Sequence, residues 1–337
     1  MSQVPLPGGS SRLRMIASFA AVYIIWGSTY LAIRIAIKTL PPFFLGGIRF
    51  TISGAILYSW ARLSGVPKPT RFNWRAAAII GALLLFLGNG SVAWAEQRVP
   101  SSVTALLMAT VPSWTVLLDW MRRGGIRPNA GVVVGVVLGF TGIVFLITQG
   151  DLVGGNALNL LGIIVLLCSA LSWSIGSLYS HYARMPDSPV LGTGMEMLAG
   201  GAFLLVAGVV SGEWKDLNPA QISLSSALAL GYLIIFGSFV AFTAFNWLLR
   251  TVAPARVATY AYVNPVVAVF LGWAIAGEPL TPRTLLSTVI IVTAVAIIIV
   301  FRTRGSGKTD ASLLKEEILA VDDAIGAIHE GTESKKN

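Results

Sequence analysis

Two charged side chains of opposite sign interrupt long apolar stretches of the sequence. Arg49 lies about two helical turns into the stretch 43–63, and Glu196 lies about two turns into the stretch 189–211. A charge within such a stretch is costly, so it usually faces a bundle interior or a watery path, where it can serve an ion or a substrate. Glu196 could relay a proton there. The alternative for both residues is a structural charge that reaches toward a membrane face.

Aromatic and amide side chains recur within or near the ends of other apolar stretches. Aromatic walls with a few amides suit a ligand that is partly apolar and carries polar groups, and the rings also allow cation–π contact with an amine. For each residue the alternative is an interfacial aromatic belt or a hydrogen bond between helices. The candidates for a ligand cavity are Trp26, Tyr30, Asn89, Trp94, Trp173, Tyr179, Asn246, Tyr260 and Asn264.

Two prolines and three glycines have spacings that affect helix shape and packing. Pro112 and Pro265 fall in the middle of apolar stretches, where each removes a backbone hydrogen bond and should kink a helix. Such a pair could form a hinge or a fixed bend. Gly131, Gly135 and Gly139 form a stripe that lets two helices approach closely. We expect this stripe to pack within the chain, with a homodimer contact as the alternative.

Side chains that could build a metal site or an enzyme active centre are scarce. Cys168 is the only cysteine, and the two histidines, His181 and His329, lie far apart in the chain. No spacing typical of metal ligands exists. The segment 305–309 resembles the end of a phosphate-binding loop, but that pattern requires a glycine where Arg302 stands. We therefore expect no metal, no cofactor and no enzymatic activity.

The composition predicts a membrane protein. Of the 337 residues, 55% are hydrophobic and 12% are charged, whereas a soluble domain carries about 25% charged residues. The net charge of +9 could suggest nucleic acid as a partner. However, the basic residues lie between apolar blocks and not along one face, so we exclude nucleic acid. Membrane lipids and a small-molecule substrate are the partners that we expect.

Ten apolar stretches are long enough to cross a bilayer as helices. Proline and glycine fill the short connections, and the stretches lack the alternation of a membrane barrel. We therefore predict an all-α integral membrane protein with ten transmembrane helices. The stretches are 13–37, 43–63, 74–95, 100–121, 129–148, 157–182, 189–211, 222–250, 254–277 and 281–302.

Lysine and arginine concentrate in alternate connections. If the N-terminus is cytoplasmic, most of them fall on the cytoplasmic side. An even number of spans then places the C-terminus on the same side. We expect a cytoplasmic N-terminal segment, 1–12, and a cytoplasmic tail, 303–337.

The two halves of the sequence match each other. Equivalent residues recur at one constant offset in the first two stretches of each half, and at a slightly different offset in the fourth. Because each half has five spans, an odd number, the second half must enter the membrane from the opposite side. We therefore predict two inverted-topology repeats, 13–148 and 157–302. The matched pairs include Trp26 with Trp173, Pro42 with Pro189, Gly47 with Gly194, Arg49 with Glu196, Gly54 with Gly201 and Pro112 with Pro265.

Several segments resemble the EamA-type transporters of the drug/metabolite transporter superfamily. The second half carries ATYAYVNPVVAVFLGWAIAGEPLTP from Ala258, and the first half carries SSVTALLMATVPSWTVLLDWMRRGGIRP from Ser101. YIIWGSTYLAIR from Tyr23 and GGIRF from Gly46 are similar to the same family. The resemblance covers about residues 15–302 and implies a ten-span bacterial inner-membrane exporter with a central cavity. The family's Gly-Glu is kept at 277–278 and is Gly-Gly at 124–125, so we expect a structural role for Glu278 at a helix end.

The function that these features favour is secondary transport. We expect an exporter of small organic metabolites, such as amino acids or amphipathic drugs, in the inner (plasma) membrane. Alternating access would run between the two repeats, as in other transporters built from inverted halves. A receptor or assembly subunit that does not transport is the alternative. A membrane-embedded enzyme would need clustered His, Asp or Cys residues, which the sequence lacks.

Overall fold

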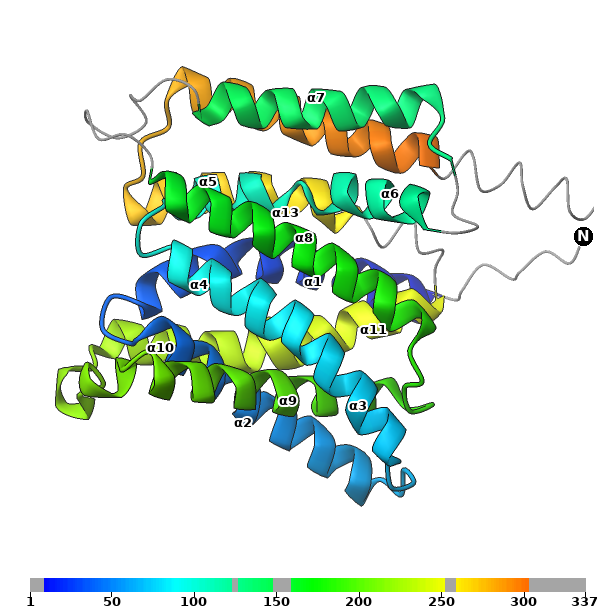
Figure 1. The fold of residues 1–337 in the computed structure, drawn as a ribbon, viewed down its shortest axis with the longest axis vertical. Coiled ribbons are helices and arrows are strands. Elements are labelled where there is room, and N and C mark those ends of the chain that lie inside the picture. The colour runs from blue at the N-terminus through cyan, green and yellow to red at the C-terminus, as the bar shows by residue number, and fades with distance from the viewer. Residues whose placement is uncertain (1–8, 123–126, 148–158, 252–258, 303–337) are drawn as a thin grey trace, which may run out of the picture.

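The computed structural model describes residues 9–122, 127–147, 159–251 and 259–302, apart from the side chains of 9–12, 246 and 249–251. All regular structure in these ranges is helical, which confirms the all-α prediction. The helices lie side by side in layers stacked along the long axis of the molecule (Figure 1).

The helices follow the predicted stretches closely. In chain order they are α1 (Gly9–Ala36), α2 (Pro42–Leu63), α3 (Arg71–Ile80), η1 (Gly81–Gly90), α4 (Ser91–Ala95), α5 (Ser101–Met108), α6 (Val111–Met121), α7 (Ala130–Ile147), α8 (Leu160–Tyr182), α9 (Pro189–Val210), the short η2 (Glu213–Lys215) and η3 (Pro219–Gln221), α10 (Leu224–Tyr232), η4 (Leu233–Val240), α11 (Ala241–Thr251), α13 (Tyr260–Ala276) and a last helix, Pro282–Arg302.

Several of these elements join into longer spans. Among the described residues, eight continuous helical stretches are long and apolar enough to cross a membrane. They include α3–η1–α4, α5–α6 and the first part of α10–η4–α11. The 22-residue α2, which carries Arg49 and Arg62, and the 17-residue α13 are not among the eight. The chain is thus a multi-pass helical membrane protein.

Proline and glycine set the ends of α2 and α9 in the same way. Each helix begins with a proline, Pro42 or Pro189, whose missing N–H is not needed in a first turn. Each is followed shortly by a glycine with positive φ, Gly65 or Gly212, both at 83°. This left-handed conformation favours glycine because it lacks a Cβ atom. The two helices therefore begin with the same residue type and are followed by the same kind of glycine turn.

α2 and α9 pack against each other through glycines. A Cβ atom placed on Gly54 would lie 2.9 Å from the carbonyl oxygen of Gly194, and one on Gly201 would lie 3.2 Å from that of Gly47. Contacts this close leave no room for a side chain and bring the two backbones together. Since Gly47 matches Gly194 and Gly54 matches Gly201 in the sequence, exchanging the halves reproduces the same two contacts.

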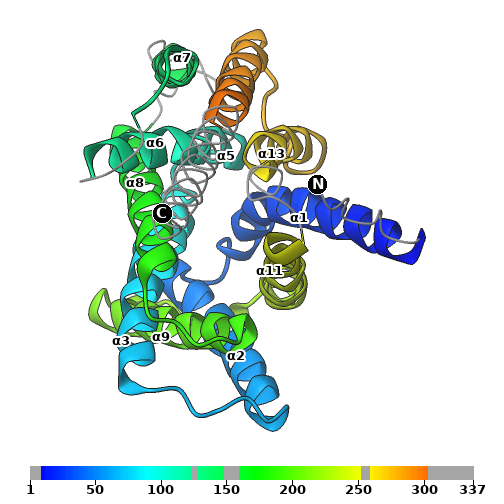
Figure 2. The same ribbon diagram turned by 90° about the vertical axis from the view of Figure 1, so that its right-hand side faces the viewer.

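α7 and the last helix lie side by side at one end of the long axis (Figures 1 and 2). The glycine stripe of α7 faces that helix. A Cβ atom on Gly131 would lie 2.3 Å from Phe301, and one on Gly135 would lie 2.7 Å from Ile298. The stripe therefore packs within the chain.

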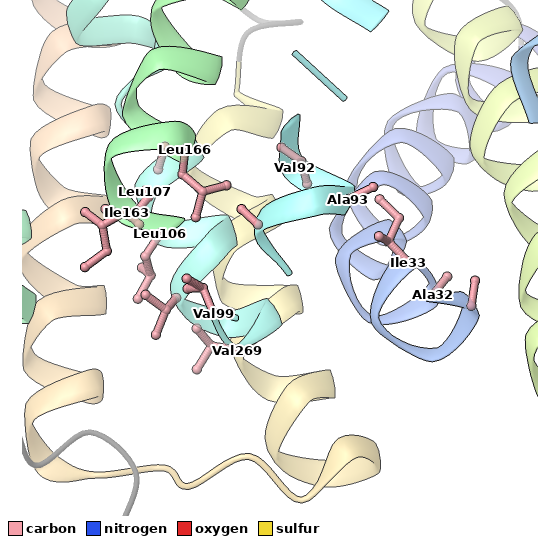
Figure 3. Packing of buried hydrophobic residues seen from close by; sticks show 14 of the residues in the cluster. Ala32, Ile33, Val92, Ala93, Val99, Leu106, Leu107, Ile163, Leu166 and Val269 are labelled. Carbon is pink, nitrogen blue, oxygen red and sulfur yellow. The ribbon is translucent and has the colours of Figure 1, made fainter. Parts of the chain in front are cut away.

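The largest apolar core gathers at one end of the bundle. Ile33 of α1, Val92 of α4, Leu106 of α5, Leu166 of α8 and Val269 of α13 converge there (Figure 3). All five are buried. Side chains from both halves of the sequence thus close this end of the molecule.

Two π-helical segments, η1 and η4, interrupt the third helix of each sequence half. Such segments are rare and occur frequently at functional sites. η1 carries Asn89, and η4 carries Gly237 and Ser238. All three residues lie at or next to the cavity described below.

Candidate ligand cavity

A cavity of about 850 Å³ lies among helices from both halves of the chain. Its size is within the range of small-molecule sites. In Figure 2 the helices α1, α11, α2, α9, α8, α5 and α13 follow one another around the middle of the molecule. The main lining residues are Trp26, Thr29, Tyr30, Ile33, Arg49, Asn89, Val92, Met108, Pro112, Asp119, Arg127, Trp173, Ser177, His181, Phe242, Tyr260, Ala261, Asn264, Pro265 and Arg302.

The cavity is closed at one end and reaches the surface at the other. Ile33 and Val92 belong both to its lining and to the large apolar core, so the core forms its floor. At the opposite end the lining includes Arg127 and Asn129, which are exposed. A ligand could therefore enter the cavity from the side of Arg127 and Asn129.

Aromatic rings form one wall of the cavity. The ring centroid of Trp26 lies 5.2 Å from that of Phe242 and 5.2 Å from that of Tyr260, both edge-on. Edge-to-face pairs at this distance are favourable and hold the rings in place. The wall combines residues of α1, α11 and α13, so it exists only in the folded chain.

Polar groups are distributed around this wall. Asn264 is 8% exposed, and its amide, oriented to satisfy its neighbours, donates to the carbonyl oxygens of Tyr23 at 3.1 Å and Tyr260 at 3.2 Å. The Asn89 amide donates to the Leu84 carbonyl oxygen at 3.4 Å. Trp173 packs on Gly88, where a Cβ atom would lie 3.0 Å from its ring.

Arg49 reaches the cavity from α2. Its Nε donates a hydrogen bond of 3.0 Å to Ser238 Oγ in η4, and its guanidinium lies 4.7 Å from the centre of the Phe50 ring. The residue is only 5% exposed. No carboxylate among the described residues pairs with it. Ser238 carries no signal in the sequence that would have singled it out.

Charged residues at the open end form a small network. Asp119 Oδ2 lies 3.0 Å from Arg302 Nη2, and Asp119 Oδ1 lies 3.4 Å from Arg122 Nη2. Arg122 lies three residues after Asp119 in the sequence, whereas Arg302 comes from the last helix.

Three other predicted residues, Trp94, Tyr179 and Glu196, are not among the residues that line the cavity. The Arg98 guanidinium lies over the Trp94 ring at 4.0 Å. Glu196 lies in α9, where its carbonyl oxygen faces Gly81. No ion pair joins Glu196 to Arg49 in the described part of the chain. The side chain of Asn246 lies outside the described residues.

Both predicted hinge residues line the cavity. Pro112 stands in the first turn of α6, just after the break that separates α5 from α6. Pro265 is buried within α13. As for metals, no cluster of three or more His, Cys, Asp or Glu side chains occurs in the described ranges.

Comparison with known proteins identifies the family. The sequence model of the EamA-like transporter family matches the chain twice, at residues 13–148 and 160–300. The chain belongs to the EamA-like transporter family.

Relatives of this EamA-family chain occur in several bacteria. It is 41% identical over 287 residues to the "Uncharacterized inner membrane transporter YedA" of Escherichia coli (strain K12), covering 85% of the chain and 90% of YedA. It is 23% identical over 285 residues to the "Uncharacterized transporter YoaV" of Bacillus subtilis (strain 168), covering 83% of the chain and 94% of YoaV.

A solved structure shares the fold. It is described as "Crystal structure of protein" and matches with a TM-score of 0.60 and 22% identity. The match covers 88% of this chain and 99% of that one. At this identity the likeness concerns the fold alone.

Proposed function

We propose that this EamA-family chain is a secondary transporter of small organic molecules, which binds its substrate in the cavity and works by alternating access. The observation that carries the proposal is a ligand-sized cavity that is closed by an apolar core at one end and open at the other. A transporter must pass through such a one-sided state, because a path open at both ends would be a pore.

Ten spans in two inverted repeats would give this motion its symmetry. Eight apolar helical stretches, together with α2 and α13, make ten. The family model matches once in each half. The two glycine contacts between α2 and α9, which map onto each other when the halves are exchanged, support a pseudo-two-fold axis between these helices. Because each half would cross the membrane five times, the repeats would run in opposite directions.

The open side is proposed to be cytoplasmic, in an inner (plasma) membrane. The start of α1 and the end of the last helix lie on the same side of the bundle in Figure 1, which supports an even number of spans. Lysine and arginine are enriched in the connections of that side, as expected for cytoplasmic loops. YedA, whose name places it in the inner membrane, supports the location. A cavity that loads from the cytoplasm suits export.

Flux through purified protein in liposomes tests the proposal. Amino acids, organic acids and amphipathic dyes would be followed in vesicles with and without the protein. Ala261→Trp should abolish the flux, because Ala261 lines the cavity and an indole would fill the space. Ala274→Trp in the same helix is the matched control, since Ala274 is exposed on the outside. Absence of flux for every compound would favour a receptor or assembly subunit.

A further inference from the structure

Arg49 is the buried charge in the cavity that the fold itself leaves without a counter-charge. It is 5% exposed, yet it belongs to the cavity lining. Only its Nε has a hydrogen-bond partner among the described residues, Ser238 Oγ. A buried guanidinium without an anion is costly, and that cost is relieved when a ligand supplies the missing charge. The forked terminal nitrogens are the groups that remain to bind it.

The charge balance of the cavity favours an anion. Its charged lining residues are Arg49, Arg127, Arg302 and Asp119. Asp119 already pairs with Arg302 and with Arg122, a residue outside the lining. Two of the three lining cations, Arg49 in the wall and Arg127 at the open end, are thus without a carboxylate partner in the described part of the chain. An anionic ligand would meet positive charge at the entrance and again at depth.

The aromatic wall converges with Arg49 on one turn of η4. Trp26 Nε1 donates to the carbonyl oxygen of Gly237 at 3.3 Å, next to Ser238, which holds Arg49. A Cβ atom on Gly237 would lie 3.2 Å from Arg49 Nη2 and 3.2 Å from Thr29 Cγ2. Because Gly237 has no side chain, the guanidinium of Arg49 can approach α1. A ligand bound to Arg49 would have its remaining atoms beside the Trp26 ring.

We propose that the substrates are small organic molecules with a carboxylate, bound by Arg49, and an apolar body that lies against Trp26, Phe242 and Tyr260. A planar carboxylate matches the two parallel N–H donors of a guanidinium, which gives orientation as well as affinity. The apolar body fits the rings of the wall. This inference rests on the proposed function, because it assigns the cavity to a transported ligand.

Binding of matched carboxylates and amides to the purified full-length protein tests the inference. The probes are 3-phenylpropionate with 3-phenylpropionamide, 4-methylpentanoate with 4-methylpentanamide, and L-phenylalanine with L-phenylalaninamide. Ligand-induced thermal stabilisation and tryptophan fluorescence would report binding. At least one carboxylate should bind, and its amide should bind at least about tenfold more weakly, because a charge-assisted hydrogen bond is lost. Equal binding of acid and amide in every pair, or no binding by any acid, would overturn the inference.

Variants of α2 separate a ligand contact from a structural role. Arg49→Gln should weaken carboxylate binding at least about tenfold and weaken amide binding less, because the amide has no negative charge and therefore loses a weaker hydrogen bond, whereas Arg49→Lys should retain part of the carboxylate binding. Arg62→Gln is the matched control, since Arg62 lies at the end of the same helix and bonds the Val66 carbonyl oxygen. Equal affinity of the wild type and Arg49→Gln for the acids would exclude the proposed contact. If Arg49→Gln does not fold, Arg49→Lys and the acid–amide comparison decide.

Two further outcomes separate this inference from the proposed function. Carboxylate binding that depends on Arg49, without flux of any bound compound in liposomes, would support the carboxylate site and contradict transport. Flux of amines or neutral compounds that is unchanged in Arg49→Lys and Arg49→Gln would support transport and contradict carboxylate binding by Arg49. Phenyl phosphate belongs in the same assay, because tighter binding of the phosphate than of every carboxylate would contradict the assignment of a carboxylate.

Discussion

The carboxylate of Glu278 lies at the start of α5, where its Oε1 accepts a hydrogen bond of 2.7 Å from the backbone N–H of Ser101. Oε1 also accepts from the Ser101 hydroxyl at 2.7 Å, and Oε2 accepts from the backbone N–H of Ser102 at 3.0 Å. A negative charge is favourable at a helix N-terminus. Gly277, with φ 68°, ends α13 and turns the chain so that Glu278 reaches α5.

Replacement of Glu278 should therefore destabilise the protein. Glu278→Ala removes the acceptor for two backbone N–H groups and should lower the free energy of unfolding by about 1–2 kcal/mol. Glu278→Gln keeps an acceptor oxygen and should lose less. Unfolding of the purified variants in mixed micelles would measure the loss of stability in each. An alanine variant as stable as the wild type would show that the link between α13 and α5 contributes nothing.

The glycine contact between α2 and α9 gives a second prediction. A Cβ atom on Gly194 would lie 2.7 Å from the backbone nitrogen of Tyr58, which cannot move aside as a flexible side chain could. Gly194→Ala should therefore separate the helices and cost about 1–3 kcal/mol. Gly231→Ala is the control, because Gly231 lies in α10 with nothing within 4 Å of its Cβ position. That change should be neutral or stabilise by up to about 1 kcal/mol. Equal loss in both variants would contradict close packing at Gly194.

The helices could be predicted from the sequence to a greater extent than the cavity. Apolar length and the positions of proline and glycine are local features, so the start of α2 at Pro42 and of α9 at Pro189 follow from them directly. The break between α5 and α6 lies directly before Pro112, where the sequence predicts a kink. The π-helical segments η1 and η4 contain no proline, and nothing in their residue types marks the change of helical geometry.

The sequence predicts which residue types line the cavity, but it does not predict which individual side chains point into it. Trp26, Trp173 and Tyr260 line it, whereas Trp94 and Tyr179, of the same residue types, do not. In a membrane protein the outward face of a helix is as apolar as the inward face, so hydrophobic periodicity cannot assign the direction. Ser238 is one of many serines, and its role depends on Arg49 from another helix. That contact becomes visible only in the folded structure.

A buried carboxyl at the closed end should make stability depend on pH. Glu96 follows α4, and both of its carboxylate oxygens lack a hydrogen-bond partner among the described residues. Burial raises the pKa of Glu96 well above its usual range, Arg34 opposes this shift, and Glu278 adds to it. The folded state therefore holds the proton more tightly than the unfolded state. This stabilisation is complete below the ordinary carboxyl pKa of about 4.3 and is lost as pH rises through the raised value.

Thermal unfolding between pH 4 and pH 9 tests this dependence. The wild type should lose stability as the pH rises, and Glu96→Gln should lose less, because the amide resembles the protonated acid and does not ionise. Asp216→Asn is the control, since Asp216 is exposed in the connection after α9. It should keep the slope of the wild type. A Glu96→Gln variant with the full slope would assign the pH dependence to other groups.

The break between α5 and α6 gives the last prediction, which concerns motion. α5 ends at Met108 and α6 begins at Val111, and the Thr110 hydroxyl donates to the Leu107 carbonyl oxygen at 2.7 Å. Pro112 has no N–H to donate to the carbonyl of Met108, four residues earlier. Pro112→Ala would supply that donor and allow one continuous helix.

If the break is a hinge for alternating access, the Pro112→Ala variant should bind ligand with unchanged affinity but transport it more slowly, without loss of stability. Initial rates of flux in liposomes, measured together with ligand affinity, test this prediction. Pro67→Ala, in the loop after α2, is the control and should keep the flux rate of the wild type. An unchanged flux rate in Pro112→Ala would show instead that the break is a fixed bend.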